Sequence, residues 1–177
     1  MLLKLKQTPG IYLVGFMGCG KSTVGACLAD ELGWSFFDLD QEIERAAGES
    51  VSEIFERRGE AEFRALETET LQKRVRDVRA GRPQVIALGG GAFTVQDNYE
   101  LAENHGITIW LDTPLDVIEK RIAGETQRPL AADPVRFRAL YEDRRQAYQR
   151  ADYRIETFDR EKDYVVARIL ALPLFQP

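Results

Sequence analysis

Short apolar runs alternate along this chain with stretches in which apolar residues recur every three or four positions. A strand buried on both faces is nearly continuous in apolar residues, whereas a helix that covers a sheet shows one apolar stripe. The first four runs each end at a glycine or an aspartate, residues typical of turns and helix caps. The runs that predict strands are 11–14, 34–37, 85–88 and 107–111, with a shorter one at 153–155.

The stretches between these runs predict helices. The first begins near Lys21 and stops at Gly33, and Ser50 with Glu53 has the spacing of a capping box. His105 marks the end of a helix before the fourth strand. Strands that alternate with helices imply a parallel sheet covered on both faces, so we expect one α/β domain over residues 1–177. Further helices are predicted at 41–47, 52–58, 60–75, 117–123, 134–148 and 164–171.

Composition narrows the class of protein. A chain of 177 residues with 44% hydrophobic and 30% charged residues is typical of one globular domain. The net charge of −5 speaks against a broad basic face, so we expect no nucleic-acid partner. No apolar run approaches the roughly 18 residues of a membrane span, and the first ten residues are too short and too interrupted by lysine for a secretory signal. One histidine and two cysteines outside any C-x-x-C pair make a zinc site improbable. We therefore expect a cytoplasmic enzyme or binding domain with no membrane contact.

Residues 15–22 match the phosphate-loop pattern G-x-x-x-x-G-K-[ST] and lie between a predicted strand and a predicted helix. Glycines let successive backbone N–H groups point inward, and the positive end of the helix adds to the same anion site. Lys21 can reach the outer phosphates, and the Ser22 hydroxyl can hold Mg²⁺. The alternative is a chance glycine-rich turn, which the strand–helix context makes improbable. Cys19, inside the loop, is expected to be an ordinary small residue rather than a redox switch.

Acidic residues at the strand ends are candidates for the chemistry of phosphoryl transfer. Such an enzyme needs an acid near Mg²⁺ and another acid or a positioned water at the acceptor. Gly89 occupies the third strand end, and Asp112 at the fourth can equally cap the next helix. Asp38 and Asp40 follow the second strand, at the edge where open α/β sheets bind ligands. We favour this pair, one acid for hydrated Mg²⁺ and one for an acceptor hydroxyl, although Asp40 can also cap the helix that follows it.

Some arginines lie where they can bind a carboxylate of the acceptor, although each alone is more often a solvated side chain and position alone does not separate them from the other arginines. A guanidinium matches a carboxylate with two parallel hydrogen bonds. Arg64 lies three residues before Glu67 and can also form a mere surface ion pair, and Arg144 lies one helical turn before Tyr148. Arg128 lies in a polar loop, 124–133, from which it can swing over bound phosphates. The run 89–91 indicates either a ligand close to the backbone or a tight turn.

In this order and spacing the motifs resemble those of the shikimate kinase family across nearly the whole chain. The phosphate loop alone is shared by many unrelated enzymes, whereas the combination of the F-R-x-x-E and G-G-G elements is specific. The motifs are G-x-x-G-x-G-K-S at 15–22, F-x-D-x-D at 36–40, E-x-E-F-R-x-x-E at 60–67, L-G-G-G-A at 88–92, R-P-L at 128–130 and R-x-x-x-Y at 144–148.

The resemblance implies a three-layer αβα phosphate-loop kinase with a central five-stranded parallel sheet, a lid at 124–133 and a shikimate-binding segment at 41–64. It implies transfer of the γ-phosphoryl group of ATP to the 3-hydroxyl of shikimate, with Mg²⁺, in aromatic amino-acid biosynthesis. The nucleotide side would comprise Gly18, Cys19, Gly20, Lys21, Ser22, Thr23, Arg121 and Arg128, with Ser22 and Asp38 at the metal. The acceptor side would comprise Asp40, Arg64, Gly89, Gly90, Gly91 and Arg144, with Asp40, Lys21 and Arg128 as the catalytic groups.

Some alternatives remain open at this stage. The stretch 144–148 lacks the family's Pro-Leu before the tyrosine, so Arg145 is an alternative to Arg144 for the carboxylate. Another small-molecule kinase of the gluconate or nucleoside-monophosphate type is the nearest rival function. A nucleotide-binding regulatory module without catalysis is the other rival. We expect a monomer whose partners are the two small-molecule substrates.

Overall fold

A computed structural model of the chain describes residues 10–123 and 133–175. Within this part of the chain, five strands form one parallel sheet in the order β2-β3-β1-β4-β5. The central strands β1, β3 and β4 are buried along their whole length, which explains their unbroken apolar runs. The strands are β1 (Gly10–Val14), β2 (Ser35–Asp38), β3 (Gln84–Ala87), β4 (Ile107–Asp112) and β5 (Tyr153–Glu156).

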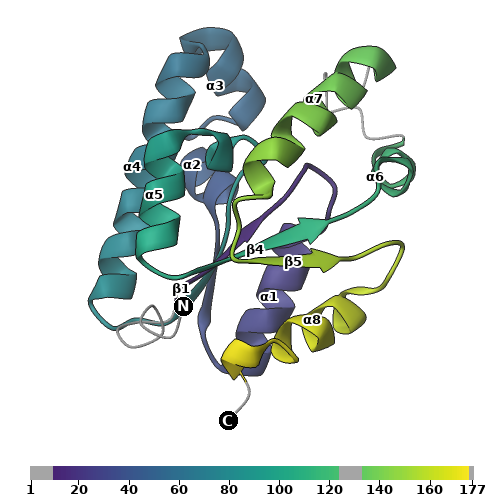
Figure 1. Cartoon of the computed structure of the whole chain (residues 1–177). Coiled ribbons are helices and arrows are strands. Elements are labelled where there is room, and N and C mark those ends of the chain that lie inside the picture. Colours follow the sequence, from purple (N-terminus) through teal and green to yellow (C-terminus); the bar gives the residue numbers. More distant parts are fainter. Residues whose placement is uncertain (1–9, 124–132, 176–177) are drawn as a thin grey trace.

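Helices cover both faces of this sheet (Figure 1). α1 and α8 pack against each other on one face, and α4, α5 and α7 lie on the other. The three-layer arrangement and the five-stranded parallel sheet are thus confirmed. The helices are α1 (Lys21–Leu32), α2 (Leu39–Ala47), α3 (Val51–Arg58), α4 (Glu60–Arg79), η2 (Ala92–Thr94), α5 (Gln96–Asn104), α6 (Leu115–Ile122), α7 (Pro134–Tyr148), α8 (Lys162–Leu170) and η4 (Pro173–Phe175).

The apolar core is divided by the sheet into two clusters of buried side chains. One cluster joins β1 to α4, α5 and α7 through residues such as Tyr12, Leu71 and Tyr148. The other joins the opposite face of the sheet to α1 and α8, through Leu28 and Ile169 among others. Burial on both faces fixes the sheet as a rigid platform, and the loops at its carboxyl edge are held by that platform.

A smaller apolar cluster lies away from the sheet, between α2, α3 and α4. It consists of the buried residues Ile43, Ile54 and Phe63 with partly buried neighbours. α3 begins with the capping box that the sequence predicts, in which Ser50 and Glu53 each bond the other's backbone N–H. This cluster holds α2 and α3 to the start of α4.

The predicted strands and the expected helices are present, with ends that differ by a few residues. The sequence indicates α5 only through its end, where His105 caps it as expected. None of the described helices is long and apolar enough to cross a membrane.

Candidate active site

The loop between β1 and α1 has the backbone shape of an anion cradle. Gly18 and Gly20 have φ angles of 76° and 95°, in the left-handed region that glycine adopts readily. The N–H of Cys19 donates to the carbonyl of Phe16 at 3.2 Å, which closes the turn. α1 begins at Lys21 directly after it, so the free N–H groups of its first turn face the loop.

Lys21 and Ser22 start α1 with their polar atoms at this loop. The Lys21 amine donates to the carbonyls of Gly15 at 2.7 Å and Phe16 at 3.1 Å, which folds the side chain back along the loop. The Ser22 hydroxyl donates to Oδ2 of Asp38 at the end of β2. A hydroxyl and a carboxylate are hard oxygen donors of the kind that Mg²⁺ accepts together with water and phosphate oxygens, so this pair fits such an ion. The described residues contain no cluster of three or more His, Cys, Asp or Glu side chains that would form a metal cage.

Asp38 and Asp40 have different tasks in the structure. Asp38 is the N-cap of α2, because its Oδ1 accepts the N–H of Gln41 at 3.2 Å. The alternative that Asp40 caps this helix is therefore wrong, and Asp40 lies in the first turn with its carboxylate buried. Its Oδ1 has no hydrogen-bond partner among the described residues. Burial, then the charge of Asp38, raises the pKa of Asp40, while Lys21 opposes the shift.

Glu67 on α4 is a buried carboxylate that the sequence suggested only as the partner in a surface pair. Its Oε1 accepts from Arg64 at 2.8 Å and from the amide of Asn98 at 3.4 Å. Only 1% of the Glu67 side chain is exposed, so the surface-pair alternative is wrong. Its second oxygen, Oε2, lacks a hydrogen-bond partner in the described part of the chain, and burial raises the pKa of the carboxyl. The buried environment of Asn98 has no signal in the sequence.

The glycine run after β3 is pressed between these side chains. A Cβ atom on Gly89 would lie 2.6 Å from Oδ1 of Asp40 and 3.2 Å from Oε2 of Glu67. A Cβ on Gly91 would overlap the guanidinium of Arg64. The run also turns, because the N–H of Ala92 bonds the Gly89 carbonyl at 3.0 Å. The tight turn expected for this run is therefore present, the neighbouring side chains also leave no room for a Cβ, and a ligand close to the backbone stays a prediction.

The structure distinguishes the two neighbouring arginines of α7. Arg144 is half-buried beside the glycine run, since its Nη1 lies 3.0 Å from where a Cβ on Gly90 would stand. Its guanidinium lies 5.7 Å from the centre of the Phe16 ring. Within the described residues no carboxylate forms an ion pair with it. Arg145 instead binds Asp112, so Arg144 is the arginine grouped with Arg64.

Asp112 does not cap α6, because the N-cap of α6 is Pro114. The alternative that Asp112 is a helix cap is therefore wrong.

A cavity of about 1190 Å³ opens at the carboxyl edge of the sheet. Arg64, Arg144, Gly89 and Gly91 are not among its described lining residues, but Gly90, which the Arg144 guanidinium approaches, is. Arg121, also in the lining, donates to the Gly18 carbonyl at 3.2 Å. The lining residues with candidate chemistry are Gly18, Cys19, Gly20, Lys21, Ser22, Thr23, Asp38, Asp40, Gly90, Arg121 and Arg160.

The structure thus brings the expected residues of the phosphate loop and Asp40 into one cavity, with the two arginines beside it. Segment 41–64 contributes Glu44 and 50–53 to the wall. Arg128 and residues 124–132 of the expected lid lie outside the described residues. Asp133, the last residue of that segment, is the N-cap of α7.

Comparisons with known proteins agree with this architecture. The family model "Shikimate kinase" matches residues 17–172. A curated shikimate kinase of Persephonella marina is 40% identical over 161 residues, 90% of this chain and 96% of that protein. One from Cereibacter sphaeroides is 37% identical over 172 residues, 96% of this chain and 83% of that protein.

Solved structures give the same result. The structure of shikimate kinase from Acinetobacter baumannii in complex with shikimate superposes on this chain with a TM-score of 0.85 at 38% identity. The match covers 94% of this chain and 93% of that protein's chain. A gluconokinase from Sinorhizobium meliloti has a TM-score of 0.55 at 16% identity, covering 93% of this chain and 91% of its own, and shares the fold alone. The chain belongs to the shikimate kinase family.

Proposed function

We propose that this protein transfers the γ-phosphoryl group of ATP to the 3-hydroxyl of shikimate, yielding shikimate 3-phosphate and ADP. One observation carries the proposal. The phosphate loop and the buried carboxylate of Asp40 line the same cavity, and the Arg144 guanidinium beside that cavity has no carboxylate partner among the described residues. A half-buried guanidinium that forms no ion pair within the described part of the chain favours an anionic ligand. The reaction belongs to aromatic amino-acid biosynthesis.

The nucleotide half of the site is assigned to the loop and its surroundings. The backbone N–H groups of 18–23 and the Lys21 amine bind the phosphates, which fits the left-handed glycines and the start of α1 at this point. Arg121 and Arg160, both in the cavity wall, lie on the side assigned to the adenine. Ser22 and Asp38 would hold Mg²⁺, which when bound supplies positive charge to the outer phosphates.

The acceptor half is assigned to the side chains around the glycine run. Arg64 and Arg144 bind the carboxylate of shikimate, while the backbone of 89–91 contacts the ring hydroxyls. The oxygen of the 3-hydroxyl forms the new bond to the γ-phosphorus as the bond between that phosphorus and the bridging oxygen of ADP breaks. Asp40 accepts the hydroxyl proton, a task that its raised pKa favours. Alignment and charge neutralisation do most of the catalytic work in such transfers.

We further propose that the chain is one kinase domain in which 41–64 holds the acceptor and 124–133 is a lid. The contact of Glu44 and 50–53 with the cavity supports the first assignment. Arg128, carried by the lid, would stabilise charge on the transferred group alongside Lys21. Closure of a lid excludes water, which otherwise competes with the acceptor hydroxyl.

The test is the release of ADP by the purified protein with shikimate, quinate or gluconate as acceptor. Shikimate should be phosphorylated at a kcat/KM well above that of either control. Arg64→Ala should raise the KM for shikimate far more than the KM for ATP, and Asp40→Asn should lower kcat with nucleotide affinity nearly unchanged. Gluconate as the preferred acceptor, or equal effects of Arg64→Ala on both substrates, would overturn the assignment.

A further inference from the structure

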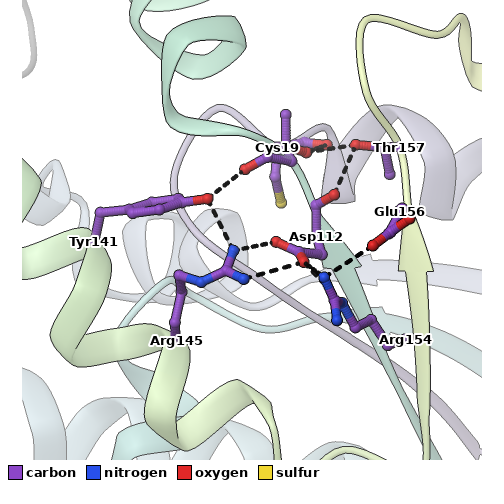
Figure 2. A network of polar contacts seen from close by, with 8 residues as sticks. Cys19, Asp112, Tyr141, Arg145, Arg154, Glu156 and Thr157 are labelled. Carbon is purple, nitrogen blue, oxygen red and sulfur yellow. Dashed lines mark hydrogen bonds and ion pairs between the residues drawn. The ribbon is translucent and has the colours of Figure 1, made fainter.

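A buried carboxylate at the end of β4 is held between two guanidiniums outside the site described above (Figure 2). The Asp112 side chain is only 6% exposed. Arg145 of α7 reaches it with Nη1 at 2.5 Å from Oδ1 and Nη2 at 3.4 Å from Oδ2. Arg154 of β5 donates to Oδ2 through Nε at 2.8 Å. Such charge-assisted, forked contacts are the strong and directional kind.

The contacts of Arg145 fasten α7 to the end of β4. Its Nη1 also donates to the Tyr141 hydroxyl at 2.9 Å, and that hydroxyl donates to the carbonyl of Thr113 at 2.9 Å. The Arg145 guanidinium lies 4.9 Å from the Trp110 ring centre, stacked on β4 as well. Two successive turns of α7 are therefore bonded to Asp112 and Thr113, and Figure 2 shows Tyr141 and Arg145 side by side on the helix.

This attachment sets the rotation of α7 about its own axis. Consecutive residues of an α-helix point about 100° apart, so the direction of Arg145 determines that of its neighbour Arg144. While Arg145 points to Asp112, Arg144 points to Phe16 and Gly90. One turn later the Tyr148 hydroxyl donates to the Gly90 carbonyl, so the same face of α7 meets the glycine run.

We propose that Asp112 and Arg145 are positioning residues that aim the Arg144 guanidinium at the carboxylate of the acceptor. The proposal rests on the function proposed above. Neither side chain lines the cavity in the described part of the chain, so each acts through the orientation of α7. Loss of the ion pair between Asp112 and Arg145 lets α7 rotate or shift. A displacement of about 1 Å at a substrate-binding group is enough to lower the rate on the order of 100-fold.

Arg145→Gln is the direct test, and Arg154→Gln is its matched control. Both changes remove one guanidinium from Asp112, but Arg154 is on β5, half exposed at 50%, and does not fasten α7. We expect Arg145→Gln to raise the KM for shikimate about 10- to 100-fold, with the KM for ATP changed less than about twofold. Arg154→Gln should change both constants less than about twofold. Equal effects of the two variants, or equal effects of Arg145→Gln on both substrates, would overturn the proposal.

A double-mutant cycle with Arg144→Ala distinguishes an effect of Arg145 on the orientation of Arg144 from a general effect on the stability of the protein. Once Arg144 has been removed, Arg145→Gln should raise the KM for shikimate no further, because it acts through the missing group. Additive effects would contradict the proposal. Arg145→Lys, which keeps the charge and loses the fork, should lie between wild type and Arg145→Gln, and it replaces Arg145→Gln in the cycle if that variant does not fold. Absence of shikimate turnover by the wild-type protein would overturn the proposed function itself, whereas wild-type turnover with an additive cycle would overturn this inference alone.

Discussion

At the scale of single residues, position 89 shows why the run after β3 has no side chains. Gly89 has no positive φ, so alanine fits its backbone, yet a Cβ there would lie 2.6 Å from Oδ1 of Asp40. We expect Gly89→Ala to displace both buried carboxylates and to lower kcat/KM for the acceptor by about 100-fold. Steady-state kinetics with varied shikimate measures this loss.

The matched control for this change is Gly81→Ala, just after the end of α4. Gly81 has a φ of 82°, and no other described atom lies within 4 Å of the place where a Cβ would stand, so alanine there is strained but meets no neighbour. It should lower the free energy of unfolding by about 1–2 kcal/mol and leave kcat/KM unchanged. Full activity in Gly89→Ala would show that the carboxylates do not need their present positions.

The buried carboxylate of Glu67 is expected to lower the stability of the folded protein at neutral pH while it orients Arg64. Burial raises its pKa in the folded protein, so its contribution to stability is greatest below the unfolded pKa of about 4.3 and is lost as the pH rises through the folded value. Glu67→Gln carries no such titration. The free energy of unfolding of this variant, relative to that of wild type, should therefore increase as the pH rises from 4 to 8. The KM for shikimate should also increase, because Arg64 loses its charged partner. Urea unfolding at several pH values measures the first effect.

Glu69→Gln is the control for Glu67→Gln, because Glu69 lies on the same helix with 62% of its side chain exposed. It should show neither the gain in stability with pH nor the change in KM. A Glu67→Gln variant that loses stability against wild type as the pH rises would contradict the sign of the effect.

Residue roles were only partly predictable from the sequence. The pattern D-x-D placed two acids at the end of a strand, but the choice of which one caps α2 depends on the backbone direction at Asp38. Likewise Asp112 could be found as an acid at a strand end, whereas its two arginine partners come from α7 and β5, over 30 residues away. Ion pairs of this kind depend on tertiary packing, so the spacing of residues along the sequence does not predict them.

At the scale of elements, α5 is fastened to α4 by a buried amide. Asn98 is fully buried, accepts from the Thr68 hydroxyl at 2.8 Å and donates to the Ala92 carbonyl at 3.2 Å and to Glu67. Asn98→Ala removes these hydrogen bonds from the core, although Glu67 keeps Arg64 and the Ala92 carbonyl keeps the N–H of Val95, and it should lower the free energy of unfolding by about 2 kcal/mol. Asn104→Ala, an exposed change at the end of the same helix, should leave it within about 0.5 kcal/mol of wild type, and chemical denaturation compares the two. Equal stabilities would mean that the amide network does not contribute.

The same asparagine explains why α5 was the element least visible in the sequence. The strands and most helices were predicted because continuous or periodic apolar residues meet the core directly. The inward face of α5 includes Asn98 beside Ala102, so its burial is satisfied by hydrogen bonds and its apolar stripe is short. A pattern of hydrophobic positions does not reveal a helix that is buried through polar groups.

At the scale of the whole molecule, the strand order brings distant segments to one edge. β1 lies between β3 and β4, so the phosphate loop after β1 is flanked by the glycine run on one side and by Asp112 on the other. The acids after β2 lie on the side of β3. Thr157, after β5, lies on the side of β4 and also lines the cavity. The parallel sheet thus accounts for an acceptor side and a nucleotide side that share the loop.

A ligand that bridges these elements should stabilise the molecule as a whole, and Lys21 tests where it binds. A nucleotide that binds only the folded state adds about 2.7 kcal/mol at a free concentration of 100 Kd. For a chain of this size that corresponds to a rise of roughly 5–10 °C in Tm, which thermal unfolding with Mg·ADP measures.

Lys21→Ala should abolish this rise at the same ADP concentration. The amine bonds two loop carbonyls and, weakly, the Cys19 sulfur at a half-buried position, so the Tm without nucleotide should change by no more than a few degrees. Lys73→Ala, which removes a half-exposed lysine from α4, should keep the full rise. Because the two variants lose the same charge, a shift retained in Lys21→Ala would place the phosphates away from the loop, and a shift lost in both would point to net charge as the cause.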